Sequence, residues 1–186
     1  MKVYQLHIQL NNIYPAIWRR IVIPSYVRLD DLHRILQTVF GWANSHLHQF
    51  DTGSEAYAPL EFEIEDTKNS RKVQVEEILK HEGSTIQYEY DFGDGWVHTL
   101  ALEKIFQFDG EVFVSQCIAG ERSGPPEDCG GVFGFQQMLE ILKNPKHEKY
   151  LEYKAWVGRN FNPEKFDLNK VNKLLQKKDY GCEWIQ

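Results

Sequence analysis

Alternating apolar and polar positions dominate the first part of the chain. Tyr4, Leu6, Ile8 and Leu10 fall on one face of residues 4–10, as in a half-buried strand. Comparable patterns predict strands at residues 17–23, 46–51, 60–65, 85–92, 96–106 and 111–118. In residues 60–65, the apolar side chains are expected to point inward.

The hydrophobic period changes to that of a helix at residues 29–40, whose apolar positions form one stripe. Asp30 or Asp31 can serve as the N-cap, and Gly41 suits the position after the last turn. Further helices are predicted at residues 75–80, 135–143, 148–157 and 164–177.

Strands followed by helices favour an α+β fold with a mostly antiparallel sheet. Short strands joined by turns are also compatible with a barrel-like closure. We predict a single domain over residues 1–186. Residues 1–120 are expected to contain mainly strands, with one helix after the second strand, and residues 121–186 are expected to be mainly helical. The hydrophobic content of 42% is sufficient for a sizeable core.

The segment YEYDFGDGWVHTL, residues 88–100, is predicted to form a hairpin with one of two registers. If its turn has two residues, Asp91 lies opposite His98 as a carboxylate–histidine pair. If its turn is the three-residue GDG, Phe92 faces Trp96, and all the aromatic residues share one face with His98. We favour the second register because the pairing of strands follows the hydrophobic face.

Histidines and carboxylates recur in three segments: HLHQFD, YDFGD and PPED. On a strand, His46 and His48 would project to the same side, and His98 or Asp91 could complete a divalent-metal site. The metal-ligand candidates are His46, His48 and His98, and the catalytic candidates are Asp91, Asp94, His98, Glu127 and Asp128. In the competing interpretation, each histidine only hydrogen-bonds a neighbour within the fold.

The stretch GPPEDCGG, residues 124–131, is expected to form a structural loop before a helix, which Asp128 could cap. Glu127 and Asp128 would repel a phosphate group there, so it is not a phosphate-binding loop. Nothing near Cys129 in the sequence indicates a nucleophilic thiolate. The five tryptophans are interpreted as anchors of the core or its rim: Trp18, Trp42, Trp96, Trp156 and Trp184.

The formal net charge of −6 and the pI of about 5.6 do not favour nucleic acid as a partner. Residues 18–20 and 170–178 are the local basic exceptions. Three cysteines without CxxC spacing argue against a disulfide scaffold and a cysteine-rich zinc site. The alternating N-terminus lacks the apolar run of a signal peptide, and no segment has the length of a membrane span. We therefore expect a cytoplasmic protein.

Five motifs occur in a fixed order: PAIWRRIVIP, LDDLHRILQTVFGW, HLHQF, YEYDFGDGWVHTLALE and PPEDCGG. Together they resemble the plasmid pRiA4b ORF-3-like family over residues 1–175. The matching positions are Trp18, Arg19, His33, Trp42, His46, His48, Phe50, Asp91, Gly93, Asp94, Trp96, His98, Pro126, Glu127, Asp128, Cys129 and Gly130. The resemblance implies a compact cytoplasmic α+β domain from bacteria or archaea. It implies no particular chemistry.

Some members of that family are labelled as passenger proteins of mobile elements. The leading hypothesis is therefore a binding or interaction module in plasmid or transposon biology, with an unknown protein or small-molecule partner. Its candidate binding residues are Trp18, Arg19, Trp42 and Trp96. A resolvase-type label also occurs in the family, but this chain has no recognisable serine-recombinase motif.

The alternative is a divalent-metal-dependent enzyme, similar to phosphoester hydrolases, that uses the His, Asp and Glu residues of the HLH, YDFGD and PPED segments. A third hypothesis is a nucleic-acid adaptor that uses Arg19, Arg20 and the C-terminal lysines. Convergence of the candidate histidines and carboxylates on one pocket would favour the enzyme.

Overall fold

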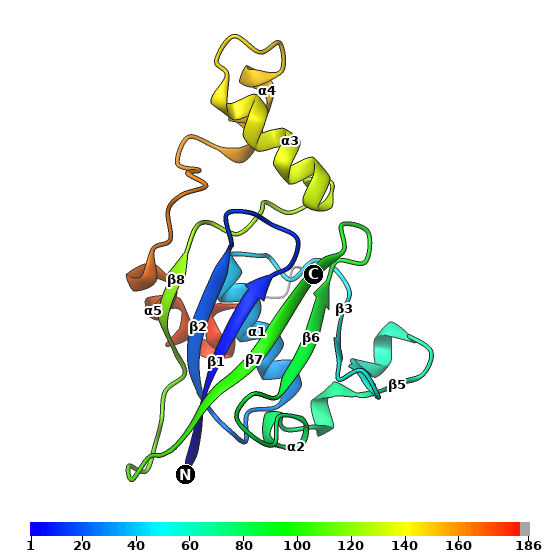
Figure 1. Cartoon of the computed structure of the whole chain (residues 1–186), viewed down its shortest axis with the longest axis vertical. Helices are drawn as coiled ribbons and strands as arrows, with labels where there is room; N and C mark the ends of the chain where they lie inside the picture. Colours follow the sequence, from blue (N-terminus) through cyan, green and yellow to red (C-terminus); the bar gives the residue numbers. More distant parts are fainter. Residues whose placement is uncertain (183–186) are drawn as a thin grey trace.

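A computed structural model describes residues 1–182, and Trp184 lies outside this range. One eight-stranded sheet, with the order β5-β4-β3-β6-β7-β1-β2-β8, forms the centre of the molecule (Figure 1). The strands are β1 (Lys2–Leu10), β2 (Trp18–Pro24), β3 (His48–Asp51), β4 (Ala56–Ala58), β5 (Thr67–Asn69), β6 (Thr85–Tyr90), β7 (Trp96–Gln107) and β8 (Gln116–Glu121). All neighbouring strands are antiparallel except β4 and β5.

The helices are α1 (Leu29–Phe40), α2 (Val75–Ile78), α3 (Gly131–Lys143), α4 (Tyr150–Val157) and α5 (Leu168–Leu175). Three 3₁₀ turns accompany them: η1 (Leu60–Phe62), η2 (Ser70–Lys72) and η3 (Lys178–Gly181). The predicted α+β fold with a mostly antiparallel sheet is confirmed. The barrel alternative is wrong, because β5 and β8 are the two open edges of the sheet.

The main core lies between the sheet and α1, which crosses one face of the strands (Figure 1). The helix buries Leu32, Ile35, Leu36 and Val39, as its apolar stripe predicts. It ends at Gly41, whose φ of 84° is left-handed and whose N–H bonds to the carbonyl of Gln37.

The predicted N-cap of α1 is wrong. Arg28 occupies that position, because its backbone pairs with Gln74 and holds the chain extended up to Leu29. Asp30 and Asp31 lie in the first turn instead. There the positive end of the helix dipole stabilises their negative charges.

Arg19 is almost completely buried among main-chain carbonyl groups. Its guanidinium donates four hydrogen bonds of 2.7–2.8 Å. The acceptors are the carbonyls of Trp18, Val39, Glu121 and Arg122. These bonds offset the cost of burying the charge and join β2, the end of α1 and β8.

The edge strand β8 is covered by one side chain of α5. Asn172 accepts a hydrogen bond from the N–H of Cys117 and donates one to its carbonyl, each 2.8 Å long. A side-chain amide thus takes the place of a neighbouring strand residue. This pairing satisfies backbone groups that an open sheet edge would leave free.

Residues 60–65 do not form the predicted strand. They contain η1, and Leu60 is exposed. Pro59 precedes the segment, and Glu63 and Asp66 adopt positive φ values of 51° and 57°. These turn conformations interrupt an extended chain despite the alternating pattern. The predicted strand at 111–118 is displaced to β8.

The β6–β7 hairpin has neither predicted register. Tyr90 pairs with Trp96 and Tyr88 with His98, so the loop contains residues 91–95. Asp91 ends β6, because its φ of 57° turns the chain away from the strand. The expected aromatic face is otherwise present and buried, although Phe92 lies outside it and is exposed.

Towards its C-terminus the chain leaves the sheet. Helices α3 and α4 pack together beyond the β1–β2 connection, and the chain then returns to α5 beside β8 (Figure 1). None of the helices in residues 1–182 has the length and apolar character needed to cross a bilayer.

Candidate functional site

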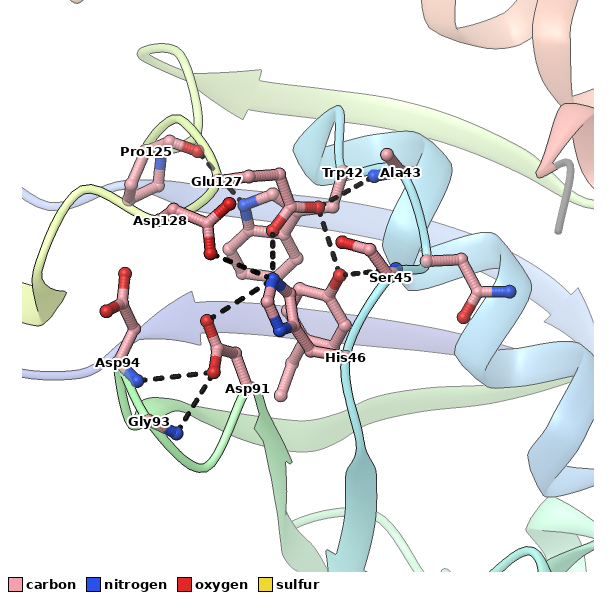
Figure 2. Close-up of polar contacts among 12 residues, drawn as sticks. Trp42, Ala43, Ser45, His46, Asp91, Gly93, Asp94, Pro125, Glu127 and Asp128 are labelled. Carbon is pink, nitrogen blue, oxygen red and sulfur yellow. Dashed lines mark hydrogen bonds and ion pairs between the residues drawn. The ribbon is translucent and has the colours of Figure 1, made fainter. Parts of the chain in front are cut away.

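Three loops at one end of the sheet bring together His46, Asp91, Glu127 and Asp128 (Figure 2). His46 follows α1 and precedes β3, so it is not yet within a strand. Asp91 follows β6, which is the neighbour of β3 in the sheet. Glu127 and Asp128 precede α3. Pairing of β3 with β6 therefore places His46 beside Asp91, and the loop before α3 closes over both.

The imidazole of His46 faces all three carboxylates. Its Nε2 lies 3.7 Å from Asp91 Oδ2, 3.8 Å from Glu127 Oε2 and 3.2 Å from Asp128 Oδ1. One ligand atom each from His46, Asp91 and Asp128 lies within 4.8 Å of the others. Donor atoms about 2.1 Å from a common ion are about 3.0–4.3 Å apart, so small side-chain shifts would accommodate one.

Each carboxylate is held in a different way. Asp91 is buried, and its Oδ1 accepts hydrogen bonds from the N–H groups of Gly93 and Asp94, which leaves Oδ2 directed at His46. Asp128 is three-quarters exposed. The cluster is therefore rigid on the side of Asp91 and open to solvent on the side of Asp128.

Glu127 is fixed through one oxygen only. Its Oε1 accepts hydrogen bonds from the N–H of Ala43, at 2.8 Å, and from the hydroxyl of Tyr90, at 3.0 Å. Its Oε2 is buried and makes no hydrogen bond within residues 1–182, and the same holds for Nε2 of His46. Buried polar atoms without partners are uncommon, and here two of them face each other.

Tyr90 connects two of the three loops, a role that the hairpin pattern did not indicate. Its hydroxyl donates to Glu127 and accepts from the N–H of Ser45, next to His46. Its ring stacks on Trp42, with centroids 4.8 Å apart. Burial raises the pKa of Tyr90, so the hydroxyl keeps its proton and can donate. The only sign of this role in the sequence is that Tyr90 stands directly before Asp91, at the start of the hairpin loop.

Asp94 belongs to the support of the cluster. Its Oδ2 accepts a hydrogen bond from the N–H of Gly130, which fixes the hairpin loop to the start of α3. A side chain on Gly131 would approach the carbonyl oxygen of Asp94 to 2.5 Å. The GG pair thus allows the two loops to touch.

His48 and His98, the other candidate metal ligands, point into the core. His48 opens β3 and stacks on His33, with ring centroids 3.4 Å apart and planes 7° from parallel. Burial lowers the pKa of His48 well below its usual value. His98 packs edge-on against Phe40 and Trp42, and burial lowers its pKa to about 3. Neither belongs to the group of side chains whose ligand atoms lie within 4.8 Å of one another, which consists of His46, Asp91 and Asp128.

The four candidate binding residues each have packing or hydrogen-bond partners within the fold. Trp42 stacks between Phe40 and Tyr90 and donates its indole N–H to the carbonyl of Pro125. Trp96 is buried against Phe135. Arg19 is bonded as described above. Trp18 is half-buried on the outer face of β2, with His7 and Arg20 against its ring.

Cys129 is not activated. Its burial, assisted by the charge of Asp94, raises the pKa of the thiol to about 12, so it stays protonated at neutral pH.

A groove of about 820 Å³ adjoins the cluster at Glu127 and Asp128. Its walls come from the end of α1, the loop before α3, and residues 156–174. Trp156, Phe161 and Phe166 give it an aromatic lining, and Lys165 and Lys170 add two positive charges.

Comparison with known proteins gives this architecture a family. The model of the plasmid pRiA4b ORF-3-like proteins matches residues 2–170. The chain belongs to the plasmid pRiA4b ORF-3-like family. The resemblance noted in the sequence motifs is thereby confirmed, and all four residues of the cluster lie inside the matched range.

Two relatives of this pRiA4b ORF-3-like chain illustrate the family. The uncharacterized protein y4hQ of Sinorhizobium fredii is 32% identical over 189 residues, which cover 99% of this chain and 95% of y4hQ. The crystal structure of MM3350 from Methanosarcina mazei, a protein of unknown function, is 36% identical with a TM-score of 0.81. That match covers 90% of this chain and 96% of MM3350. Neither name states an activity.

Proposed function

We propose that this chain binds one divalent transition-metal ion between His46, Asp91 and Asp128 and uses it for hydrolysis. The observation that carries the proposal is the buried Nε2 of His46, which has no hydrogen bond and faces carboxylate oxygens from two further loops. An imidazole with carboxylates suits zinc, manganese or iron better than calcium or magnesium. The exposed side of Asp128 leaves coordination positions for water and substrate, as in catalytic metal sites.

The competing interpretation of the same geometry is a protonated His46 that forms ion pairs with the carboxylates. Such a cluster would need no metal. Burial of Nε2 argues for the metal, since a protonated imidazole would be expected to align its N–H with one acceptor. In the structure none of the three contacts is a hydrogen bond.

Metal content decides between the two. Protein purified without chelators should contain about one equivalent of metal by elemental analysis. Calorimetric titration of the stripped protein with Zn²⁺ and Mn²⁺ should give a single site. At a free-ion concentration 100-fold above Kd, binding should stabilise the fold by about 2.7 kcal/mol, or about 5–10 °C in Tm.

Three variants locate the site. His46→Ala and Asp91→Asn should abolish stoichiometric binding, while Asp128→Asn, which changes the most exposed ligand, should weaken it about tenfold. His81→Ala and Asp109→Asn alter exposed residues elsewhere and should bind as the parent does. Absence of saturable binding by the parent protein would contradict the proposal and leave the protonated cluster.

A binding module without chemistry is the second candidate, and the groove beside the Pro125–Asp128 loop favours it. Its size lies in the range typical of small-molecule sites, about 300–1,000 Å³. Metal-free protein that binds a ligand in this groove, with no dependence on His46, would support that candidate. The link to mobile elements rests on the family resemblance alone and stays a prediction.

A further inference from the structure

The groove beside the cluster is lined by cationic and acidic side chains in equal number. The cations are Arg19, Lys165 and Lys170, and the acidic residues are Glu127, Asp128 and Asp167. The total charge of the lining therefore gives no preference for a ligand, and the distribution of the charges decides. Glu127 and Asp128 face the imidazole of His46, whereas both lysines belong to the wall formed by residues 162–174.

The start of this wall is held against the chain just beyond β8. The N–H of Ser123 donates to the carbonyl of Pro163 at 3.0 Å. The hydroxyl of Ser123 lies 2.8 Å from the carbonyl oxygen of Asn162 and 2.7 Å from that of Lys165. Figure 1 shows this segment, coloured orange, on its way from α4 to α5 beside β8. Because the backbone at Lys165 is already ordered, binding of a ligand there costs no ordering of the chain.

The carboxylates nearest to the two lysines in the sequence have other partners. Glu164 accepts two hydrogen bonds from the guanidinium of Arg122, at 2.7 and 3.1 Å. Asp167 accepts the backbone N–H of Lys170 at 2.9 Å and so caps α5. Within residues 1–182, neither groove lysine forms an ion pair. Both ammonium groups are therefore available to an anion in the groove.

Arg19 adds a positive charge to the lining from below the surface. It is 1% exposed, and its four hydrogen-bond acceptors are neutral carbonyl groups, so no carboxylate neutralises it. The ring of Phe166 covers the guanidinium, with its centroid 3.9 Å from Cζ. A buried charge is screened less by water and salt than an exposed one. It therefore attracts an anion in the groove without touching it.

Aromatic side chains supply the apolar surface of the groove. Trp156 of α4 is 47% exposed, and Phe161 and Phe166 are half-buried. Aromatic rings pack well against flat apolar groups, either stacked or edge to face. The volume of about 820 Å³ has room for a drug-sized molecule.

We propose that this groove binds a small organic anion. The flat aromatic or apolar body of the ligand packs on Trp156 and Phe161, and its carboxylate or phosphate group pairs with Lys165 and Lys170. The inference names the ligand class of the groove, so it rests on the second candidate function and not on the metal.

Calorimetric titration of the metal-free protein tests the ligand class with three probes that share a naphthalene ring: naphthoate, naphthyl phosphate and neutral naphthamide. Two exposed ion pairs change affinity by about 2- to 30-fold, and Arg19 adds to them. We therefore expect the better anion to bind at least about fivefold more tightly than the amide. A rise in NaCl from about 20 mM to about 300 mM should weaken the anion more than the amide.

The better of the two anions tells whether the groove prefers a carboxylate or a phosphate. A smaller ratio between anion and amide would overturn the preference for an anion, even if the amide itself binds and the groove remains a ligand site. Absence of binding by all three probes would overturn the inference as a whole.

Two substitutions remove one charge each from the wall. Lys165→Gln and Lys170→Gln should each weaken binding of the anion by about 2- to 5-fold and leave the amide unchanged. The double variant should bind anion and amide alike. Lys173→Gln changes the net charge equally at an exposed position of α5 that does not line the groove, so it is the matched control. An equal loss in this control would overturn the pairing with the two groove lysines.

Two further variants locate the ligand. Trp156→Ala, with folding checked by circular dichroism, should weaken all three probes by about 2- to 10-fold. Unchanged affinities would overturn the aromatic wall. His46→Ala should bind naphthoate as the parent does, and loss of binding there would place the ligand at the cluster instead. Metal binding is measured separately, so failure of the probes refutes this inference alone, whereas absence of metal binding refutes only the metal function.

Discussion

Mild acid should destabilise this protein through three buried histidines. His33, His48 and His98 are each almost inaccessible to solvent. Burial lowers the pKa of His33 and His98 from 6.5 to about 3, and it lowers that of His48 in the same direction. The unfolded chain therefore binds protons first as the pH falls. The stabilisation is fully present above pH 6.5 and is lost progressively towards pH 3.

The size of the effect follows from linkage. Between pH 7 and pH 5, each histidine that is neutral in the fold and titrates at 6.5 when unfolded costs about 2 kcal/mol. Three such residues give about 6 kcal/mol, which is comparable to the whole stability of many domains. Protonation of either ring in the His33–His48 stack would also place a charge against a second imidazole 3.4 Å away.

The pH dependence of the free energy of unfolding can be measured by urea unfolding at pH 7, 6 and 5. The ionic strength is kept constant, and unfolding is followed by tryptophan fluorescence. His48→Phe keeps a flat ring in the stack and removes two nitrogens that have no hydrogen bond to described residues. The loss of stability between pH 7 and 5 should shrink by about one third in this variant. A parent protein whose stability changes by less than about 1 kcal/mol over this range would refute the reasoning. An unchanged slope in His48→Phe would refute the contribution of His48.

Three further substitutions test other features of the fold. Arg19→Lys should lower the free energy of unfolding in urea by about 2–4 kcal/mol, because an ammonium group has fewer donors than the four surrounding carbonyl groups require. A loss below about 0.5 kcal/mol would show that these carbonyl groups adapt to the lysine. Asn172→Ala should cost about 1–2 kcal/mol and increase self-association in size-exclusion chromatography, because the backbone of Cys117 loses both partners; a strictly monomeric variant of parental stability would contradict this. Gly134→Ala would place a Cβ 1.9 Å from the carbonyl oxygen of Cys129, so α3 must shift. If the proposed metal site is present, its affinity should fall, because Asp128 lies in the loop before this helix. If calorimetric titration gave the variant the same metal affinity as the parent protein, the position of α3 would have no effect on the proposed site.

The fold was predictable where burial leaves a periodic trace in the sequence. Strand β1 alternates because one of its faces packs on α1, and α1 carries its apolar stripe for the same reason. Residues 60–65 carry the same alternation without being a strand. Their conformation depends on turn residues, Glu63 and Asp66, whose positive φ has no signature in the hydrophobic pattern.

The candidate site was predictable by residue type and not by arrangement. Asp91, Glu127 and Asp128 stand out as carboxylates near turns, but their meeting depends on the pairing of β3 with β6. The spacing of two residues between His46 and His48 suggested that both side chains project to the same side of a strand. This was misleading, because β3 begins only at His48. His46 is therefore free of the strand geometry and turns to the cluster. The contribution of Tyr90 was hidden because an aromatic residue in a strand normally indicates packing alone.

The position of β1 in the sheet affects how the chain can be made. Residues 2–10 lie between β2 and β7, and Lys2 pairs with Gln107. On the ribosome, β1 and β2 can pair early, but one side of β1 waits for about a hundred further residues to emerge. Until then an apolar strand remains unpaired along its edge, a state that is prone to aggregation. Nascent chains that stop before β7 should therefore require a chaperone, and the proposed metal site, completed only at Asp128, could form only after this step.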